Sequence, residues 1–324
     1  MDFSRDGRLL LTVSGDDTVR LWDVENGQVT WSLDRANASR AFFAVDDAQI
    51  ALVGRDRQIS VYRLEDRTLV RAFEGIAGNV GPAAVSPDGR LLALGAEDGT
   101  VAVWDLAGER RAFVLAAHIF PVRGVYFSPD STLLATVSAE RAVRLWDMAS
   151  GETRAILADF DQRPYVAAFS PDSGQVAVGL TGQVRTWATA DGALLRTITT
   201  ASRAAIRQLA FTADGRLLGG GEQDAVSIWD AVTGEQLAGL PDHGPDFHDM
   251  ALNPAGDLLV TVARPGRTFL WDMSNPNQRV QLSAEADEIS LAGWTADGRV
   301  LILAAADGAL HFWGIPGEPL TADR

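Results

Sequence analysis

The chain repeats one pattern about every forty residues: a turn, an apolar run, a second turn and a short segment that ends in an aromatic residue. Successive endings lie 40, 42, 42, 41, 42, 42 and 42 residues apart. The ending is Tyr62 in one copy, and in the others it is Trp22, Trp104, Trp146, Trp187, Trp229, Trp271 and Trp313. A period in the forties built from short strands is typical of a β-propeller, in which each repeat forms one four-stranded blade. We therefore predict an all-β propeller of eight blades in which these tryptophans are structural, with Trp146 mostly buried.

The repeat at 116–157 shows why each copy predicts four strands. The strands are expected at 122–127, 132–138, 142–146 and 153–157. The turn at 128–131 reads Ser-Pro-Asp-Ser, in which Pro pre-sets φ and the Asp side chain can bond to its own backbone. The second strand is nearly all apolar, as expected for a strand covered on both faces by neighbouring blades.

Composition excludes several classes of function. There is no cysteine, which excludes disulfides, thiolate metal ligands and a cysteine nucleophile. All 28 basic residues are arginine, so chemistry that requires a lysine is excluded as well. The net charge of −15 argues against nucleic acid as the main partner, because that binding requires a cationic surface.

The sequence shows no membrane or export signal. Its apolar stretches are too short to cross a bilayer as a helix, and residues 1–8 do not read as a secretory leader. We therefore expect a cytoplasmic protein that does not bind membranes.

The eight units resemble the WD40 repeat family over essentially the whole chain. The Trp-Asp pair of that family stands at 22–23, 104–105, 146–147, 229–230 and 271–272. It is altered to Tyr62-Arg63, Trp187-Ala188 and Trp313-Gly314. The resemblance is to a bacterial type of array. It implies that the propeller is the C-terminal part of a larger multidomain signalling protein.

The resemblance also implies a polar relay inside each blade that links a His, a Ser or Thr that closes the second strand, an Asp and the Trp. In the fourth repeat these places are taken by His118, Ser138 and Trp146, with Glu140 where Asp is expected. No repeat carries the full set, so we expect apolar stacking and ring closure to supply most of the stability.

We interpret residues 1–324 as a single domain. The expected blades are approximately 1–33, 34–73, 74–115, 116–157, 158–198, 199–240, 241–282 and 283–324. The last strand of the eighth blade is expected around 319–323. The alternatives are a seven-bladed ring plus an extra repeat, or a section of a longer tandem array. Since the first blade has only residues 1–3 for its first strand, we expect residues 1–7 to be poorly paired, either by truncation of a longer protein or because the ring closes without a full first strand.

Few residues point to catalysis. There is no Gly-x-Ser-x-Gly motif, and the four histidines are scattered over several repeats. The densest polar segment, 242–249, holds two His and three Asp and could hold a divalent metal. The other interpretation is a polar loop between blades, and we predict neither a metal nor a cofactor.

The remaining candidate is a surface on which the resemblance implies that partners dock. Arg123, Tyr165, Arg207 and His248 each lie five residues before the Ser, Thr or Asn of a first turn. The full set of candidate partner-binding residues is Arg123, Arg163, Tyr165, Arg207, His248, Glu97, Glu222 and Arg264. Arginine pairs bidentately with carboxylates, so we expect these residues to bind an acidic segment of another protein. The alternative is a rim of solvated arginines without a partner.

Two classes of function follow from these patterns. We favour a non-enzymatic protein–protein interaction platform, a monomeric ring that acts as a scaffold or sensor in a larger assembly. The alternative is a propeller hydrolase or lyase that uses acids at the channel mouth together with His248.

Overall fold

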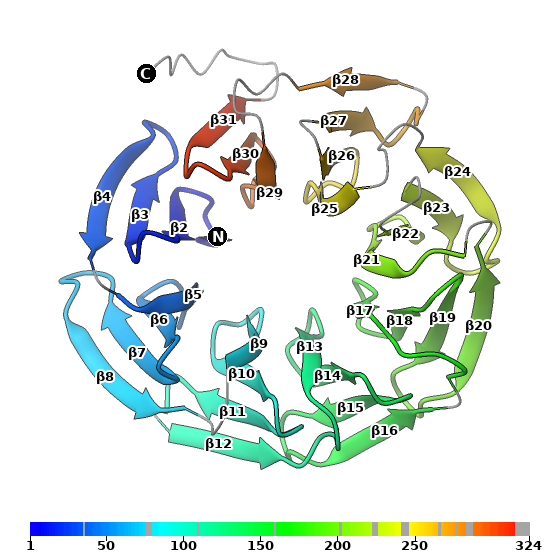
Figure 1. The fold of residues 1–324 in the computed structure, drawn as a ribbon, viewed down its shortest axis with the longest axis horizontal. Helices are drawn as coiled ribbons and strands as arrows, with labels where there is room; N and C mark the ends of the chain where they lie inside the picture. The colour runs from blue at the N-terminus through cyan, green and yellow to red at the C-terminus, as the bar shows by residue number, and fades with distance from the viewer. Residues whose placement is uncertain are drawn as a thin grey trace. The chain divides into compact units, whose positions relative to one another are not determined.

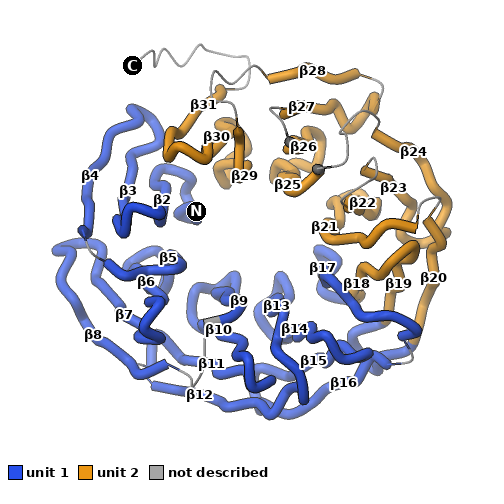
Figure 2. The backbone as a smooth tube through the Cα atoms, viewed as in Figure 1, with its two compact units in different colours: residues 1–174, 188–193 blue, residues 175–187, 194–324 orange. Residues whose placement is uncertain are grey.

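The computed structural model describes residues 1–34, 36–75, 80–108, 110–158, 160–200, 203–221, 226–240, 246–264, 267–276, 278–282 and 288–314. These residues form 31 β-strands and no helix (Figure 1). The chain divides into two compact units, which Figure 2 colours separately. The first unit is Met1–Gly174 with Ala188–Ala193, and the second is Gln175–Trp187 with Leu194–Arg324.

The first unit contains four antiparallel sheets of four consecutive strands each. The first sheet is β1 (Asp2–Phe3), β2 (Leu9–Val13), β3 (Val19–Asp23) and β4 (Gln28–Leu33). The second is β5 (Ala38–Ala44), β6 (Gln49–Gly54), β7 (Gln58–Arg63) and β8 (Leu69–Glu74). The third is β9 (Val80–Val85), β10 (Leu91–Ala96), β11 (Val101–Asp105) and β12 (Arg110–Leu115). The fourth is β13 (Val122–Phe127), β14 (Leu133–Ser138), β15 (Val143–Asp147) and β16 (Thr153–Leu157).

The fifth sheet is β17 (Val166–Phe169), β18 (Gln175–Gly179), β19 (Gln183–Ala188) and β20 (Leu194–Thr199). The sixth is β21 (Ile206–Phe211), β22 (Arg216–Gly221), β23 (Val226–Asp230) and β24 (Gln236–Leu240). The seventh is β25 (Asp246–Leu252), β26 (Leu258–Arg264), β27 (Arg267–Asp272) and β28 (Arg279–Gln281). The described part of the eighth is β29 (Ile289–Trp294), β30 (Val300–Ala305) and β31 (Leu310–Gly314). The predicted fourth strand around 319–323 lies outside the described residues.

The turn between the first and second strand of a sheet is held by its own polar side chains. In the fourth sheet, Ser128 Oγ donates to Asp130 Oδ1 at 2.6 Å and accepts from Leu133 N at 2.9 Å. Ser131 adopts a φ of 62°, a left-handed conformation that the tight turn requires. The same serine–aspartate bond joins Ser86 to Asp88 in the third sheet and Ser170 to Asp172 in the fifth. The Ser-Pro-Asp pattern of the sequence therefore folds locally as predicted.

Apolar layers between successive sheets form the core. The second strand β14 is buried at every position, whereas the fourth strand β16 is mostly exposed. One layer joins the third and fourth sheets and contains Val101, Val122, Leu134 and Trp146. In the second unit, a similar layer joins the sixth and seventh sheets through residues that include Ile228 and Trp271. Within each unit, these sheets therefore bury apolar faces against their neighbours, as predicted for propeller blades.

The repeated tryptophans are buried to different degrees. Trp104, Trp229 and Trp271 are each 1% exposed, and Trp146 is 6% exposed, so the prediction for Trp146 is confirmed. Trp22 and Trp313, by contrast, are only half-buried. The indole therefore contributes most to the core in the third to seventh sheets.

The expectation for residues 1–7 is wrong. Asp2 pairs with Leu11 and Phe3 pairs with Leu10, so even this two-residue strand completes the first sheet. The Asp2 carboxylate also accepts a hydrogen bond of 2.7 Å from the backbone N–H of Phe43 in β5. Burial raises the pKa of Asp2, while the bond from Phe43 acts in the opposite direction. A single side chain thus anchors a strand that its length alone would leave frayed.

We predict that Trp146→Ala lowers the free energy of unfolding by about 3–5 kcal/mol, as large-to-small changes in a core do. Trp22→Ala should cost clearly less, because the Trp22 side chain is less completely buried. Urea unfolding followed by circular dichroism measures both. Equal losses for the two variants would show that the burial of the indole does not set its contribution.

Candidate functional site

The first strands of the sheets share an irregularity at one equivalent position. In five of them a single residue is skipped in the pairing with the second strand, which is the signature of a β-bulge. The skipped residues are Ser39, Arg123, Arg207, His248 and Ser290. In β9 the shift falls between Val80 and Ala83, which includes Gly81.

These bulges explain why arginines that we predicted as partner-binding residues are exposed. A bulge bends its strand and changes the direction of a side chain, and bulges are frequent next to functional sites. Arg123 and Arg207 are exposed at this position, although their strand neighbours Val122 and Ile206 are buried. The positions of these arginines were predicted from their spacing of five residues before the Ser or Thr of the turn. The bulge itself was not predicted.

The first unit presents Arg123 in β13 and the pair Arg163 and Tyr165 just before β17. The Arg163 guanidinium lies over the Tyr165 ring, with its carbon 5.1 Å from the ring centroid. This is a cation–π contact, which holds the arginine in one orientation while leaving its donors accessible. Arg123 and Arg163 are both exposed, and Tyr165 is half-buried.

The second unit presents Arg207 in β21 and His248 in β25, and the two differ in role. Arg207 is exposed. The His248 ring donates through Nε2 to the carbonyl oxygen of Ile289 at 3.1 Å. The next residue, Asp249, accepts from Ala292 N at 2.9 Å. His248 therefore links β25 to β29, and its imidazole serves the fold more directly than we predicted.

The three remaining candidates were predicted in turns between the second and third strands. Glu97 follows β10 and is exposed. Arg264 is the last residue of β26, but its side chain lies outside the described residues, as does the whole of Glu222.

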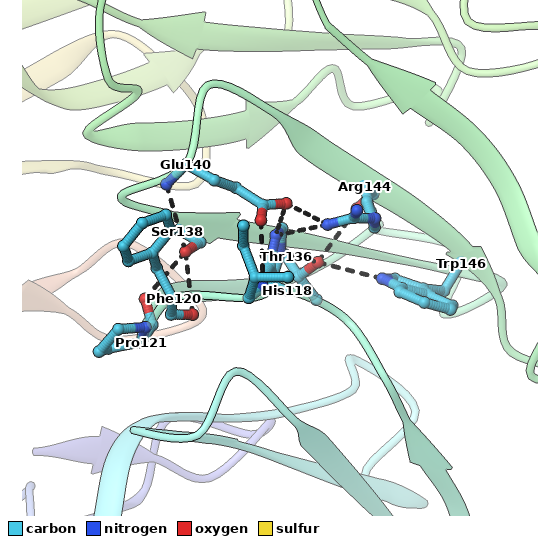
Figure 3. A network of polar contacts seen from close by, with 9 residues as sticks. His118, Phe120, Pro121, Thr136, Ser138, Glu140, Arg144 and Trp146 are labelled. Atoms are coloured by element: carbon cyan, nitrogen blue, oxygen red, sulfur yellow. Dashed lines mark hydrogen bonds and ion pairs between the residues drawn. The ribbon is translucent and has the colours of Figure 1, made fainter.

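A buried polar relay runs through the fourth sheet (Figure 3). Trp146 Nε1 donates to Thr136 Oγ1 at 3.0 Å, and Thr136 Oγ1 lies 2.8 Å from His118 Nε2. His118 Nδ1 lies 2.5 Å from Glu140 Oε1. A neutral imidazole with its proton on Nδ1 satisfies the whole relay, because the Thr136 hydroxyl then donates to Nε2 and Nδ1–H donates to Glu140.

The assignment of Ser138 to this relay is wrong. Thr136 pairs directly with Arg144, two residues before Trp146, so its hydroxyl is the one within reach of the indole. Ser138 closes the strand and its Oγ lies 3.1 Å from Phe120 O and 3.0 Å from Pro121 O. It therefore holds the loop that follows His118 rather than the relay.

The pKa values of Glu140 and His118 both lie below their ordinary values in this relay. Burial raises the pKa of Glu140, but hydrogen bonds from His118, the Ile119 N–H and Arg144 outweigh it, so its pKa lies below its ordinary value. Burial also lowers the pKa of His118, and the nearby Glu140 offsets this only in part. The Arg144 guanidinium pairs with the same carboxylate.

The Trp–Thr bond recurs outside the fourth sheet. Trp22 Nε1 donates to Thr12 at 2.8 Å, and Trp271 Nε1 donates to Thr261 at 2.8 Å. In each case the threonine stands ten residues before the tryptophan. This ten-residue spacing is the sequence signal that identifies the threonine bonded to each of these indoles. It was not among our predictions.

A cleft of about 600 Å³ lies at the opposite end of the third and fourth sheets, among the first-to-second and third-to-fourth strand turns. Its carboxylates are held by local donors: Asp105 accepts from Gly108 N at 2.8 Å and from Arg90 at 3.2 Å. Burial raises the pKa of Asp105, but these donors bring it below its ordinary value. A general acid at neutral pH requires a raised pKa, so Asp105 does not have the character of a general acid.

Two further features are absent from the part of the chain that the structure describes. No group of three or more His, Cys, Asp or Glu side chains is arranged to hold a metal there. Most of the predicted alternative metal segment, 242–249, has no described side chains. The described residues also include no helix with the length and apolar character needed to span a membrane.

The sheets are the blades of a β-propeller. The crystal structure of a computationally designed protein, Ika8, matches with a TM-score of 0.83 over 95% of this chain and 93% of that one, at 21% identity. At that identity the match establishes the fold alone. The family model described as WD domain, G-beta repeat matches residues 1–23, 69–105 and 110–147. These three segments therefore match the WD40 repeat, within a chain that folds as a β-propeller.

Curated relatives match along much of this chain. Telomerase protein component 1 of Mus musculus is 26% identical over 98% of this chain and 12% of its own length. Autophagy-related protein 16 of Arabidopsis thaliana is 24% identical over 80% of this chain and 52% of its own length. The Periodic tryptophan protein 2 homolog of Dictyostelium discoideum is 20% identical over 79% of this chain and 24% of its own length. The chain thus spans about half or less of the length of these relatives.

We predict that Thr136→Val lowers the free energy of unfolding by about 1–3 kcal/mol, because it leaves the buried Trp146 N–H and His118 Nε2 without a partner. Thr186→Val is the matched control, since Thr186 is fully buried and its hydroxyl has no hydrogen-bond partner among the described residues. This control should be neutral or stabilising. Chemical unfolding of both variants measures the difference, and equal losses would contradict the relay.

The relay also predicts a dependence of stability on pH. Because the pKa of His118 in the fold lies below its usual 6.5, the unfolded chain takes up a proton first as the pH falls through 6.5. The stability that the neutral His118 contributes is therefore present above that pH and is lost below it. The lowered pKa of Glu140 adds a second loss as the pH falls through 4.5.

His118→Gln should remove the first of these losses. The unfolding free energy of the variant, measured between about pH 7 and pH 5, should then vary less than that of the parent chain. The same slope in both proteins would mean that His118 does not titrate differently on folding.

Proposed function

We propose that this chain is a non-enzymatic protein-interaction platform, a scaffold or sensor module that works within a larger assembly. The observation that carries the proposal is the exposed arginine placed on a β-bulge, as at Arg123 and Arg207. Each unit supplies its own candidate residues, which are Arg123, Arg163 and Tyr165 in the first and Arg207 and His248 in the second.

The chemistry of the first set favours an acidic protein segment. Guanidinium groups pair bidentately with carboxylates, and arginine and tyrosine are enriched among residues that dominate binding energies. Tyr165 supports Arg163 through the cation–π contact, which lowers the conformational entropy that binding would cost. With a net charge of −15, the chain offers little attraction to a nucleic acid backbone, so we favour a protein partner.

The relatives are consistent with a shared module rather than a shared reaction. Their names refer to telomerase, autophagy and periodic tryptophan. A fold can be common to many functions, and what a WD40 propeller contributes in common is a set of loops on rigid sheets. We propose a cytoplasmic setting, in keeping with the absence of cysteine.

The proposed function predicts that Arg123→Glu combined with Arg163→Glu weakens binding of an acidic peptide. The probe is an acidic peptide containing phenylalanine, chosen from a synthetic array for binding to the parent chain. The loss should be on the order of 2–5 kcal/mol, with a slower association rate. Fluorescence anisotropy and stopped-flow mixing measure the two quantities.

Arg154→Glu is the matched control, because Arg154 is exposed on β16, the last strand of the fourth sheet. It should bind like the parent, and Arg207→Glu tests the second unit separately. If no acidic peptide of the array binds, or if the double variant binds as tightly as the parent, the arginines form a solvated rim without a partner.

A further inference from the structure

The loop between β12 and β13 presents two large apolar side chains to solvent. Ile119 is 82% exposed, the highest value for a large apolar side chain in the described part of the chain, and Phe120 is 50% exposed. Most of the other exposed large apolar side chains lie on fourth strands, as Val114 does on β12 and Ile156 on β16. Two adjacent ones at a loop tip form a small apolar patch, which is a common mark of an interaction site.

The backbone of this loop is fixed from beneath by the neighbouring turns. His118 N donates to Gly99 O at 2.9 Å, and Ile119 N donates to Glu140 Oε2 at 3.1 Å. A Cβ on Gly99 would lie 2.0 Å from His118 O, so the loop rests directly on a residue that must be glycine. The start of the loop therefore cannot move without disturbing the buried relay.

The second half of the loop is fixed by Ser138. Its hydroxyl lies within hydrogen-bond distance of both Phe120 O and Pro121 O, as Figure 3 shows. The polar atoms of the backbone thus point inward, while the Ile119 and Phe120 side chains remain exposed. A loop that is already ordered loses little conformational entropy when a partner covers it.

Two unpaired cations flank this apolar pair. Arg123 follows the loop in β13, and Arg141 is next to Glu140, whose carboxylate holds the Ile119 N–H. Both arginines are exposed, and neither forms an ion pair with any residue that the structure describes. The Glu140 carboxylate is already engaged by a hydrogen bond from His118 and by the ion pair with Arg144.

The turn on the other side of the loop is acidic, so it would favour one orientation of a bound acidic segment. Glu97 and Asp98 lie in the turn that contains Gly99, and Asp98 accepts from Thr100 at 2.9 Å. A bound segment would therefore place its own acids toward Arg123 and Arg141, away from this turn.

We propose that Ile119 and Phe120 are the apolar anchor for a segment of another protein in which an apolar side chain stands next to carboxylates. The apolar side chain would pack on Ile119 and Phe120, and the carboxylates would pair with Arg123 and Arg141. This inference rests on the proposed function and specifies its partner.

Charge alone is a poor source of affinity for such a partner. The net charge of −15 repels an acidic segment at long range, and salt screens the exposed arginines. Apolar contact is not weakened by salt, so it supplies the part of the affinity that the arginines cannot.

The test uses two synthetic acidic peptides that differ at one position, Leu in one and Gln in the other. The full chain, Ile119→Ser/Phe120→Ser and the control Val114→Ser/Ile156→Ser are titrated with each peptide by fluorescence anisotropy. The loop variant should bind the Leu peptide at least about tenfold more weakly than the parent, and the control should bind like the parent. The Gln peptide should bind weakly to all three, and raising the salt should weaken it more than the Leu peptide.

The outcomes separate the two proposals. If the loop variant binds the Leu peptide as tightly as the parent, while Arg123→Glu/Arg163→Glu does not, the anchor is overturned and the platform stands. If neither peptide binds the parent chain, the proposed function fails together with the anchor. Because the substituted side chains are exposed, circular dichroism should show all variants folded.

Discussion

The structure depends on the apolar layers that join successive sheets. A sheet with apolar residues on both faces cannot be stable alone and must be covered by neighbouring sheets. Buried second strands such as β14 and tryptophans such as Trp104 and Trp271 supply these layers. The consequence for function is that the sheets are rigid and the loops at their ends need not contribute to the core.

The sequence predicted the blades well because their causes are local. The period, the apolar second strand and the Ser-Pro-Asp turn each depend on residues close together in the chain. The prediction failed where a contact between distant residues decides the outcome. The first strand is held by Asp2 through a bond to Phe43, and the choice of Thr136 over Ser138 depends on which residue lies opposite Arg144.

The candidate site was predictable in position but not in geometry. The spacing from the turns predicted the positions of Arg123 and Arg207. A bulge, however, arises from the pairing of two strands, and the sequence of one strand does not predict it. The anchoring of Ile119 was hidden for the same reason. The anchoring depends on both carboxylate oxygens of Glu140, because Oε1 contacts His118 in the relay and Oε2 accepts from the Ile119 N–H. The sequence had placed Glu140 only in the relay.

The bulges have a further consequence for how such a chain can change over evolutionary time. A paired residue in a strand is constrained by the residue opposite, and an insertion there would turn every following side chain to the other face. A bulged residue has no opposite residue, so Arg123 or Ser39 can be replaced without disturbing a cross-strand pair of its sheet. Recognition can therefore diversify blade by blade while the scaffold is inherited unchanged.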